Sequence, residues 1–184
     1  MNIKTTAVER TTWSDEAIVR RVLQGDTPVY RFIVERYQDI VYACAYAITG
    51  SDSDAKDAAQ EAFIRVYRHL AQFDPSRPLK LYLMRIAVNC SRNISGTRRG
   101  WEPLEETSEI VKPADATAPE RHAAVRELVE RLPQTLREVC ALFYFAEHSC
   151  REVAEILQMN ESAVKVALHL ARKKLLTDWR CAYE

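Results

Sequence analysis

The chain of 184 residues carries 26 Lys and Arg against 26 Asp and Glu, with 47% hydrophobic residues and only 4 glycines. The apolar content excludes an intrinsically disordered chain, and the length allows one ordinary domain or two small ones, each with its own core. Scarce glycine together with abundant Ala, Leu, Glu and Arg predicts an all-α fold.

Charge is distributed unevenly along the chain, although the formal net charge is zero. Residues 1–100 carry 15 basic and 11 acidic side chains, residues 101–125 carry 2 and 6, and residues 126–184 carry 9 and 9. The basic first part is compatible with a polyanionic partner, which the total charge alone would argue against. We hypothesise that the acidic middle stretch shields basic surfaces when no such partner is bound.

The N-terminus has no apolar segment of signal-peptide length, and no later run is long enough to span a membrane, so we expect a cytoplasmic protein. The five cysteines, an odd number, contain no CxxC pair, so neither a disulfide framework nor a standard zinc site is indicated. We expect reduced thiols and no cofactor, with Cys44 and Cys140 buried on apolar helix faces.

Apolar residues that recur at three- and four-residue steps predict a helical first domain over residues 1–96. The first helix begins after Ser14, a good N-cap, and ends at Gly25. The second begins near Pro28 and continues as a long core-facing helix until Gly50 closes it.

The third helix of this domain begins in the acidic run 51–54, because hydroxyls and carboxylates stabilise the amide end of a helix. The fourth runs from about Leu79 to about Asn93, and Gly96 is expected to end the domain. Periodicity then disappears over residues 97–120, where prolines interrupt a run rich in Glu, Thr, Ser and Ala. This composition predicts a flexible acidic linker.

A second helical domain is predicted over residues 121–184. Residues 151–157 form a short helix, residues 158–161 a tight connection, and a final helix runs from Ser162 to about Trp179. This order and spacing are typical of a helix-turn-helix.

Two segments carry a resemblance to a known family. The run 54–63, with Leu70 and Phe73, is similar to the polymerase-docking helix of the extracytoplasmic-function sigma factors of bacterial RNA polymerase. Residues 151–157 and 162–175, with Leu132-Pro133 and Arg137, resemble the helix-turn-helix module of the same family. The resemblance covers nearly the whole chain and implies a non-enzymatic subunit that directs the polymerase to promoter DNA.

The resemblance implies that the third helix docks on the clamp region of RNA polymerase core enzyme, since its polar face can meet a complementary charged helix. A plain solvated face is the alternative reading of the same pattern. The implied docking residues are Asp54, Asp57, Gln60, Glu61 and Arg68.

The resemblance also implies that residues 73–93 capture the upstream promoter element and open the duplex. Opening requires stacking on aromatic rings and cations along the backbone. The candidate residues there are Lys80, Tyr82, Arg85, Asn89 and Arg92, with a core position as the alternative for Tyr82. In the helix-turn-helix they are Arg151, Ser162, Lys165, His169, Arg172 and Lys173.

The last helix departs from the family pattern, because apolar Val166, Ala167 and Leu170 are expected on its outer face. Apolar groups can contact thymine methyls but cannot make a bidentate contact to guanine. This motivates an alternative hypothesis, a sigma-like regulator that reads DNA poorly and acts through protein contacts, including a possible anti-sigma factor.

A third hypothesis is a redox or metal sensor that uses Cys140, His148, Cys150 and Cys181, although their spacing matches no standard ligand set. An enzyme is the least supported class. The sequence contains no glycine-rich phosphate loop, nucleophile elbow or HExxH motif.

Overall fold

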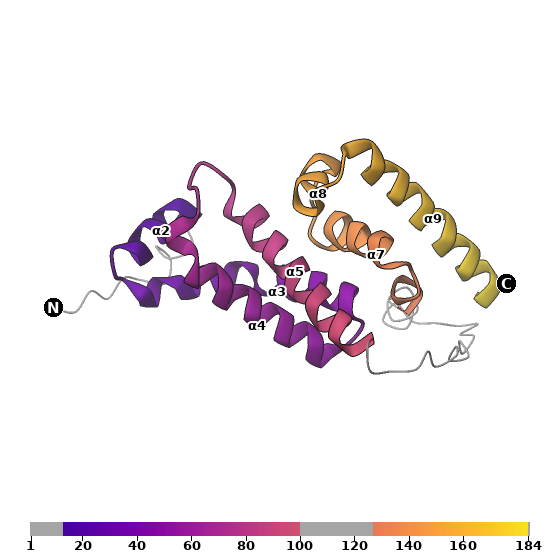
Figure 1. Ribbon diagram of the computed structural model, residues 1–184, viewed down its shortest axis with the longest axis horizontal. Coiled ribbons are helices and arrows are strands. Elements are labelled where there is room, and N and C mark those ends of the chain that lie inside the picture. Colours follow the sequence, from indigo (N-terminus) through magenta and orange to yellow (C-terminus); the bar gives the residue numbers. More distant parts are fainter. Residues whose placement is uncertain (1–12, 100–126, 184) are drawn as a thin grey trace.

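The computed structural model describes residues 13–99 and 127–183, and within these ranges every regular element is a helix. The all-α prediction is confirmed. The first domain contains α2 (Asp15–Leu23), a 3₁₀ turn η1 (Thr27–Tyr30), α3 (Arg31–Thr49), α4 (Asp52–Arg68), η2 (Leu70–Gln72) and α5 (Leu79–Arg99). Helices α3, α4 and α5 pack against one another as its centre (Figure 1).

The second domain contains α7 (Gln134–Cys140), a π-helical turn η3 (Ala141–Phe145), α8 (Cys150–Leu157) and α9 (Glu161–Tyr183). Helix α9 packs on α7 and α8 and forms the outer side of the domain, farthest from the first one (Figure 1). The predicted helix-turn-helix corresponds to α8, residues 158–160 and α9. The final helix ends at Tyr183, later than the predicted end near Trp179.

Local capping explains where most helices begin. The Ser14 hydroxyl accepts a hydrogen bond from the Ala17 amide, and that of Ser51 accepts one from the Asp54 amide. Each satisfies a backbone N–H that would otherwise lack a partner. Ser149 and Glu152 form a reciprocal capping box at the start of α8.

Gly50 ends α3 in the left-handed region, at φ 71°. A Cβ there would lie 3.1 Å from the side chain of Glu130 in the second domain. The positive φ therefore favours glycine here, and a larger residue would also press against the Glu130 side chain.

The fourth helix extends beyond Asn93, where it was predicted to end, and includes Gly96. Helix α5 continues through it to Arg99, and Gly96 is not among the glycines with positive φ. Glycine inside a helix costs only about 1 kcal/mol relative to alanine, which does not stop a helix unless the backbone also turns. Residues 100–120 of the predicted linker lie outside the described residues.

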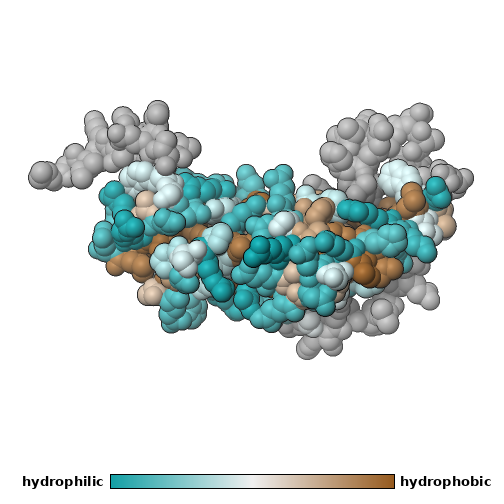
Figure 2. Space-filling view, turned by 90° about the horizontal axis from the view of Figure 1, so that it is seen from above, coloured by the Kyte–Doolittle hydropathy of each residue, from teal (hydrophilic) through white to brown (hydrophobic). Residues whose placement is uncertain are grey.

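A separate core was expected in each domain, but the buried residues of the two domains are largely joined. One cluster extends from α2 through α5 into α7, η3, α8 and α9, and a smaller one joins Leu132, Cys140 and Ala171. The domains therefore pack directly on each other, through α3 with α7 and η3 and through α5 with α8. Hydrophilic residues cover most of the face in Figure 2, and hydrophobic ones form smaller patches.

Within the described ranges, no helix combines the length and the apolar character that crossing a bilayer requires.

Candidate functional site

Helix α4 has one buried face and one polar face. Small and apolar side chains, from Ala55 to Val66, pack inward against α3 and α5. The opposite side carries the five predicted docking residues at helical spacing. Asp57, Gln60 and Arg68 are exposed, whereas Asp54 and Glu61 are half-buried. The fold therefore brings the five predicted docking residues together on one surface.

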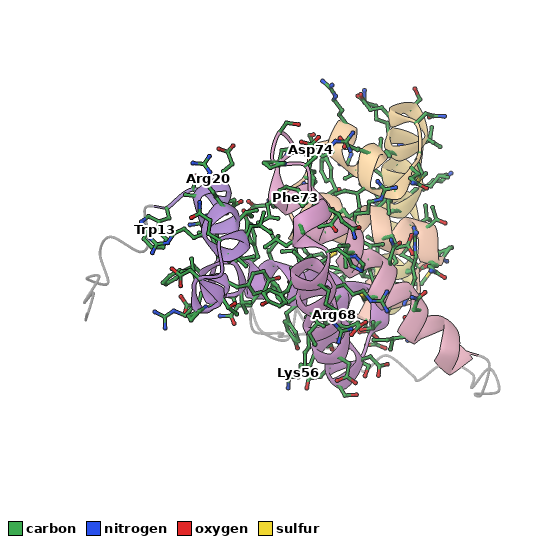
Figure 3. The ribbon with its side chains drawn as sticks, turned by 60° about the vertical axis from the view of Figure 1, so that its left-hand side comes forward. Trp13, Arg20, Lys56, Arg68, Phe73 and Asp74 are labelled. Atoms are coloured by element: carbon green, nitrogen blue, oxygen red, sulfur yellow. The ribbon has the colours of Figure 1, made fainter. Side chains whose placement is uncertain are left out.

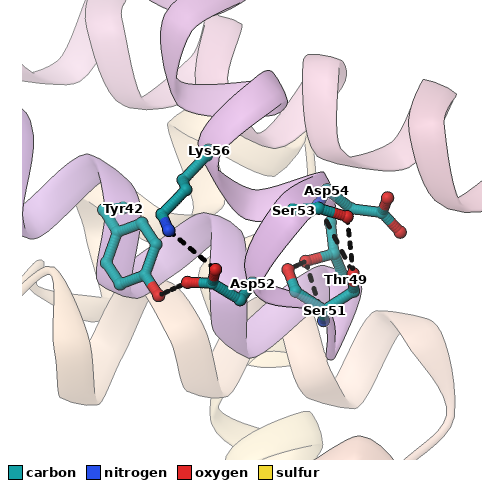
Figure 4. Close-up of polar contacts among 7 residues, drawn as sticks. All are labelled: Tyr42, Thr49, Ser51, Asp52, Ser53, Asp54 and Lys56. Atoms are coloured by element: carbon teal, nitrogen blue, oxygen red, sulfur yellow. Dashed lines mark hydrogen bonds and ion pairs between the residues drawn. The ribbon is translucent and has the colours of Figure 1, made fainter.

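The first turn of α4 is tied to α3 by a polar network (Figure 4). Asp52 accepts hydrogen bonds from the Tyr42 hydroxyl and the Lys56 ammonium, each at 2.7 Å. The charge of Lys56 is therefore paired with that of Asp52. Figure 3 shows Lys56 on α4, the helix that also carries Arg68.

An apolar groove of about 720 Å³ runs beside the polar face of α4, between this helix and η1 and α3. Its lining includes Tyr30, Val34, Phe63, Ile64 and Tyr67, and it reaches Gln60. The rings of Tyr30 and Tyr67 lie 5.1 Å apart, and Tyr30 donates a hydrogen bond to the Phe63 carbonyl at 2.8 Å. This groove was not predicted. The signal available in the sequence was Tyr67, an aromatic residue directly before the charged Arg68, and its side chain is 40% exposed in the structure.

Helix α5 carries a second set of candidates beside the connection that contains Phe73 and Asp74 (Figure 3). Tyr82 is half-buried, with its ring 5.1 Å from that of Phe73, and burial raises the pKa of its hydroxyl. Both rings line a groove of about 360 Å³ together with Arg77 and Arg85. Tyr82 therefore has both a packing partner and an open side.

The remaining α5 candidates face different directions. Asn89 is exposed, and Arg85 and Arg92 are half-buried. Lys80 precedes Tyr82 by two residues, which places it about 200° around the helix, apart from that ring. Arg77 was not predicted, although a cation between two prolines in an exposed connection was a signal.

Arg92 is partly exposed and also contacts the second domain. Its Nε and one terminal nitrogen donate to the two carboxylate oxygens of Glu138 on α7, both at 2.7 Å. Only 3% of the Glu138 side chain is exposed, and it also accepts a hydrogen bond from Gln134. A carboxylate buried this far needs such partners, since an unpaired one would be strongly destabilising.

The neighbouring Arg137 is also buried and joins the domains. Its guanidinium donates to the Ile48 carbonyl, in the last turn of α3, at 3.0 Å and to the Leu132 carbonyl at 3.2 Å. These bonds satisfy carbonyls near helix ends that lack partners within a helix.

Helix α9 presents the predicted recognition face. Ser162, Lys165, His169, Arg172 and Lys173 are all exposed, and Arg151 is exposed at the start of α8. Lys165 pairs with Glu161 at 2.6 Å, and Arg172 donates to the Tyr144 hydroxyl at 2.6 Å. The five α9 residues lie along one side of the helix.

The placement of Ala167 in the outer apolar patch was wrong. Ala167 is 6% exposed and packs inward with Val164, Leu168 and Ala171. A core-facing helix buries a stripe at steps of three and four, which includes position 167. Val166 and Leu170 are 58% and 48% exposed, so these two residues of the predicted patch do lie on the outer side.

The cysteines and His148 do not form a ligand set. Among the described residues, no group of three or more His, Cys, Asp or Glu side chains is placed to hold a metal ion. Burial raises the pKa of Cys44 to about 12 and of Cys140 to about 11, which keeps both thiols protonated. Cys150 is half-buried and Cys181 exposed.

His148 makes the stability of the fold dependent on pH. It is buried directly before α8; burial and then Lys80 lower its pKa, whereas Glu152 raises it. An unfolded histidine binds its proton near pH 6.5. The unfolded chain therefore holds more protons than the folded one at acidic pH, and the contribution of His148 is present above this pH and lost below it.

We predict that the free energy of unfolding falls between about pH 7.5 and pH 5.5, by at most about 1.4 kcal/mol per pH unit for one proton. The change His148→Gln should flatten this dependence. Urea unfolding followed by circular dichroism at both pH values measures it, and equal slopes for the variant and the parent protein would refute the role of His148.

The geometry of the two domains defines a class of protein. A helix-turn-helix whose second helix exposes a row of cations, joined to a helical domain with separate polar and cationic faces, is the architecture of a DNA-binding transcription protein.

Comparisons with known proteins identify the family. Residues 33–99 match the Sigma-70 region 2 family, and residues 122–175 match the Sigma-70 region 4 family. The chain is 33% identical to the ECF RNA polymerase sigma factor SigW of Bacillus subtilis, over 88% of this chain and 95% of that protein. The chain belongs to the extracytoplasmic-function (ECF) sigma factors, transcription initiation factors that direct RNA polymerase to promoters.

Solved structures agree at the level of the fold. The chain is similar to CnrH, solved in complex with the cytosolic domain of CnrY, with a TM-score of 0.72 and 24% identity over 91% of this chain and 97% of CnrH. It is also similar to the Bartonella quintana sigma factor RpoE, solved with the anti-sigma factor NepR, with a TM-score of 0.62 and 17% identity over 78% and 93%.

Proposed function

We propose that this sigma factor binds RNA polymerase core enzyme through the polar face of α4 and the apolar groove beside it. A charged strip next to an apolar groove suits a helical partner, because charge complementarity orients the partner while apolar burial stabilises the contact. In this proposal Asp57, Gln60 and Glu61 meet the clamp. The polymerase supplies all catalysis, and the protein acts in the cytoplasm.

Promoter DNA is contacted by both domains in this proposal. Tyr82 stacks on an unpaired base while Arg85, Asn89 and Arg92 hold the strand. The α9 face contacts duplex DNA, with Lys165 and Lys173 on phosphates and Arg172 on base edges. The row of exposed cations on α9, held by a buried opposite side, is the observation that carries this assignment.

Run-off transcription with purified core enzyme on genomic fragments tests the proposal. Discrete transcripts are expected only when this protein is added. Failure of the folded protein to associate with core enzyme would refute it.

The exposed pair Val166 and Leu170 supports a second candidate, a sigma-like regulator that reads DNA weakly and acts through a protein partner. The structurally similar RpoE was solved with an anti-sigma factor. We propose that an anti-sigma factor also contacts Val166 and Leu170 here. Under this candidate α9 should bind no duplex even at low salt.

A further inference from the structure

A pocket lies between the two domains, where α3 meets η3 and the residues directly before α7. Its volume is about 190 Å³. The lining, hereafter the interdomain pocket, includes Tyr42, Ala43, Tyr46 and Ala47 of α3, Glu130, and Phe145 of η3. Both domains therefore contribute to its wall.

Three of the lining residues are aromatic. The rings of Tyr42 and Tyr46 lie 6.1 Å apart on adjacent turns of α3, and Phe145 adds a third ring from the second domain. The Tyr42 hydroxyl donates a hydrogen bond to Asp52 at 2.7 Å, which holds this ring in place (Figure 4). Because the face of an aromatic ring carries partial negative charge, such a wall attracts cations as well as apolar groups.

Glu130 adds a full negative charge to the same pocket. Its side chain is half-buried and lies against Gly50 at the end of α3. No hydrogen bond or ion pair joins its carboxylate to another residue within 13–99 or 127–183. Burial raises the pKa of this carboxyl, and Arg137 lowers it by a smaller amount. A cation bound beside the carboxylate would therefore offset the cost of its burial.

The cations of the chain near this pocket are engaged by other groups. The guanidinium of Arg137 donates to the carbonyls of Ile48 and Leu132. The Lys56 ammonium, close to the Tyr42 hydroxyl, is paired with Asp52 at 2.7 Å. Neither forms an ion pair with Glu130, so the charge on its carboxylate is left for a ligand.

We propose that the interdomain pocket binds a small organic cation, an ammonium group with compact apolar substituents. Glu130 pairs with the charge, and the rings of Tyr42, Tyr46 and Phe145 contact the substituents. An apolar cavity of about 150 Å³ is known to hold benzene, so a pocket of this size accommodates a ligand as large as choline. The five predicted docking residues and the exposed cations of α9 take no part, so this proposal is independent of the proposed function.

Isothermal titration calorimetry of the full-length protein with choline tests the proposal. The matched probe is neohexyl alcohol, a neutral molecule of the same shape in which a carbon atom replaces the nitrogen of choline. Choline is expected to bind with a Kd of about 1 mM or lower, and the alcohol at least about tenfold more weakly. Choline should also raise the Tm of the protein, because it binds only the folded chain.

Two variants separate the charge from the cavity. Glu130→Gln removes the charge with little change of shape, so choline should bind at least about tenfold more weakly and lose its advantage over the alcohol. Ala43→Leu fills the pocket while Glu130 stays in place, so both probes should lose binding. Leucine is a good helix former, so α3 is retained, and circular dichroism verifies this.

Glu127→Gln is the matched control, because Glu127 pairs with Arg131 and does not line the pocket. It should bind choline with nearly the affinity of the parent protein. Equal affinity of the parent protein for choline and for the alcohol would overturn the proposal, as would choline binding that persists unchanged in the folded Glu130→Gln or Ala43→Leu variant. The absence of saturable binding up to about 10 mM choline would overturn it too.

Discussion

Asp57→Arg on α4 should reduce the affinity for RNA polymerase core enzyme at least about 100-fold, which corresponds to about 2.7 kcal/mol. Asp57 is exposed in the middle of the polar face, and in the proposed complex a reversed charge would place a cation against a polymerase surface that attracts a carboxylate. Glu61→Arg should act in the same direction. Glu61 pairs with Arg65 at 2.6 Å, so an arginine at position 61 would stand beside Arg65. This repulsion between like charges should weaken α4 slightly.

The matched control is Asp39→Arg, the same change at an exposed position on α3 outside the docking surface. Fluorescence titration of each variant with core enzyme gives the affinity, and circular dichroism verifies the helical content. Normal core affinity of a folded Asp57→Arg variant would show that the polar face of α4 is only a solvated surface.

Lys165→Ala combined with Lys173→Ala should weaken binding of the holoenzyme to promoter duplex about tenfold or more. Both ammonium groups project from the exposed side of α9 and are assigned to phosphates. Each lost phosphate contact should lower the dependence of log affinity on log salt by about 0.9. Titration of the holoenzyme with labelled promoter DNA at several salt concentrations measures both quantities.

Val166→Ser combined with Leu170→Ser is the counterpart on the same helix. If α9 reads DNA mainly through its cations, this variant binds the duplex with nearly unchanged affinity and an unchanged salt dependence. If α9 acts instead through a protein partner, the two lysines can be replaced without effect, and the loss of function follows the apolar pair.

Helix ends that depend on neighbouring residues could be predicted from the sequence. Ser14 and Ser51 cap their helices as expected, and Gly50 closes α3 with a positive φ. The end of α5 was predicted too early, near Asn93, because local residues do not show where the chain turns, and Gly96 lies inside the helix without a positive φ.

The faces of single helices were also largely predictable. The predicted docking residues on α4 share one surface, since helical periodicity alone sets their direction. The error at Ala167 came from the assumed width of the buried stripe, which depends on how closely α9 packs against its neighbours. The groove near Tyr67 was missed because three elements form it.

The sequence by itself determined the helices, most of their caps, the helix-turn-helix and the family, because these depend on residues close together in the chain. Only the tertiary structure decided that the domains share a buried cluster and that Arg92 is paired with Glu138, a residue 46 positions away. A buried carboxylate is stable only where a distant cation reaches it, and no local pattern encodes that distance.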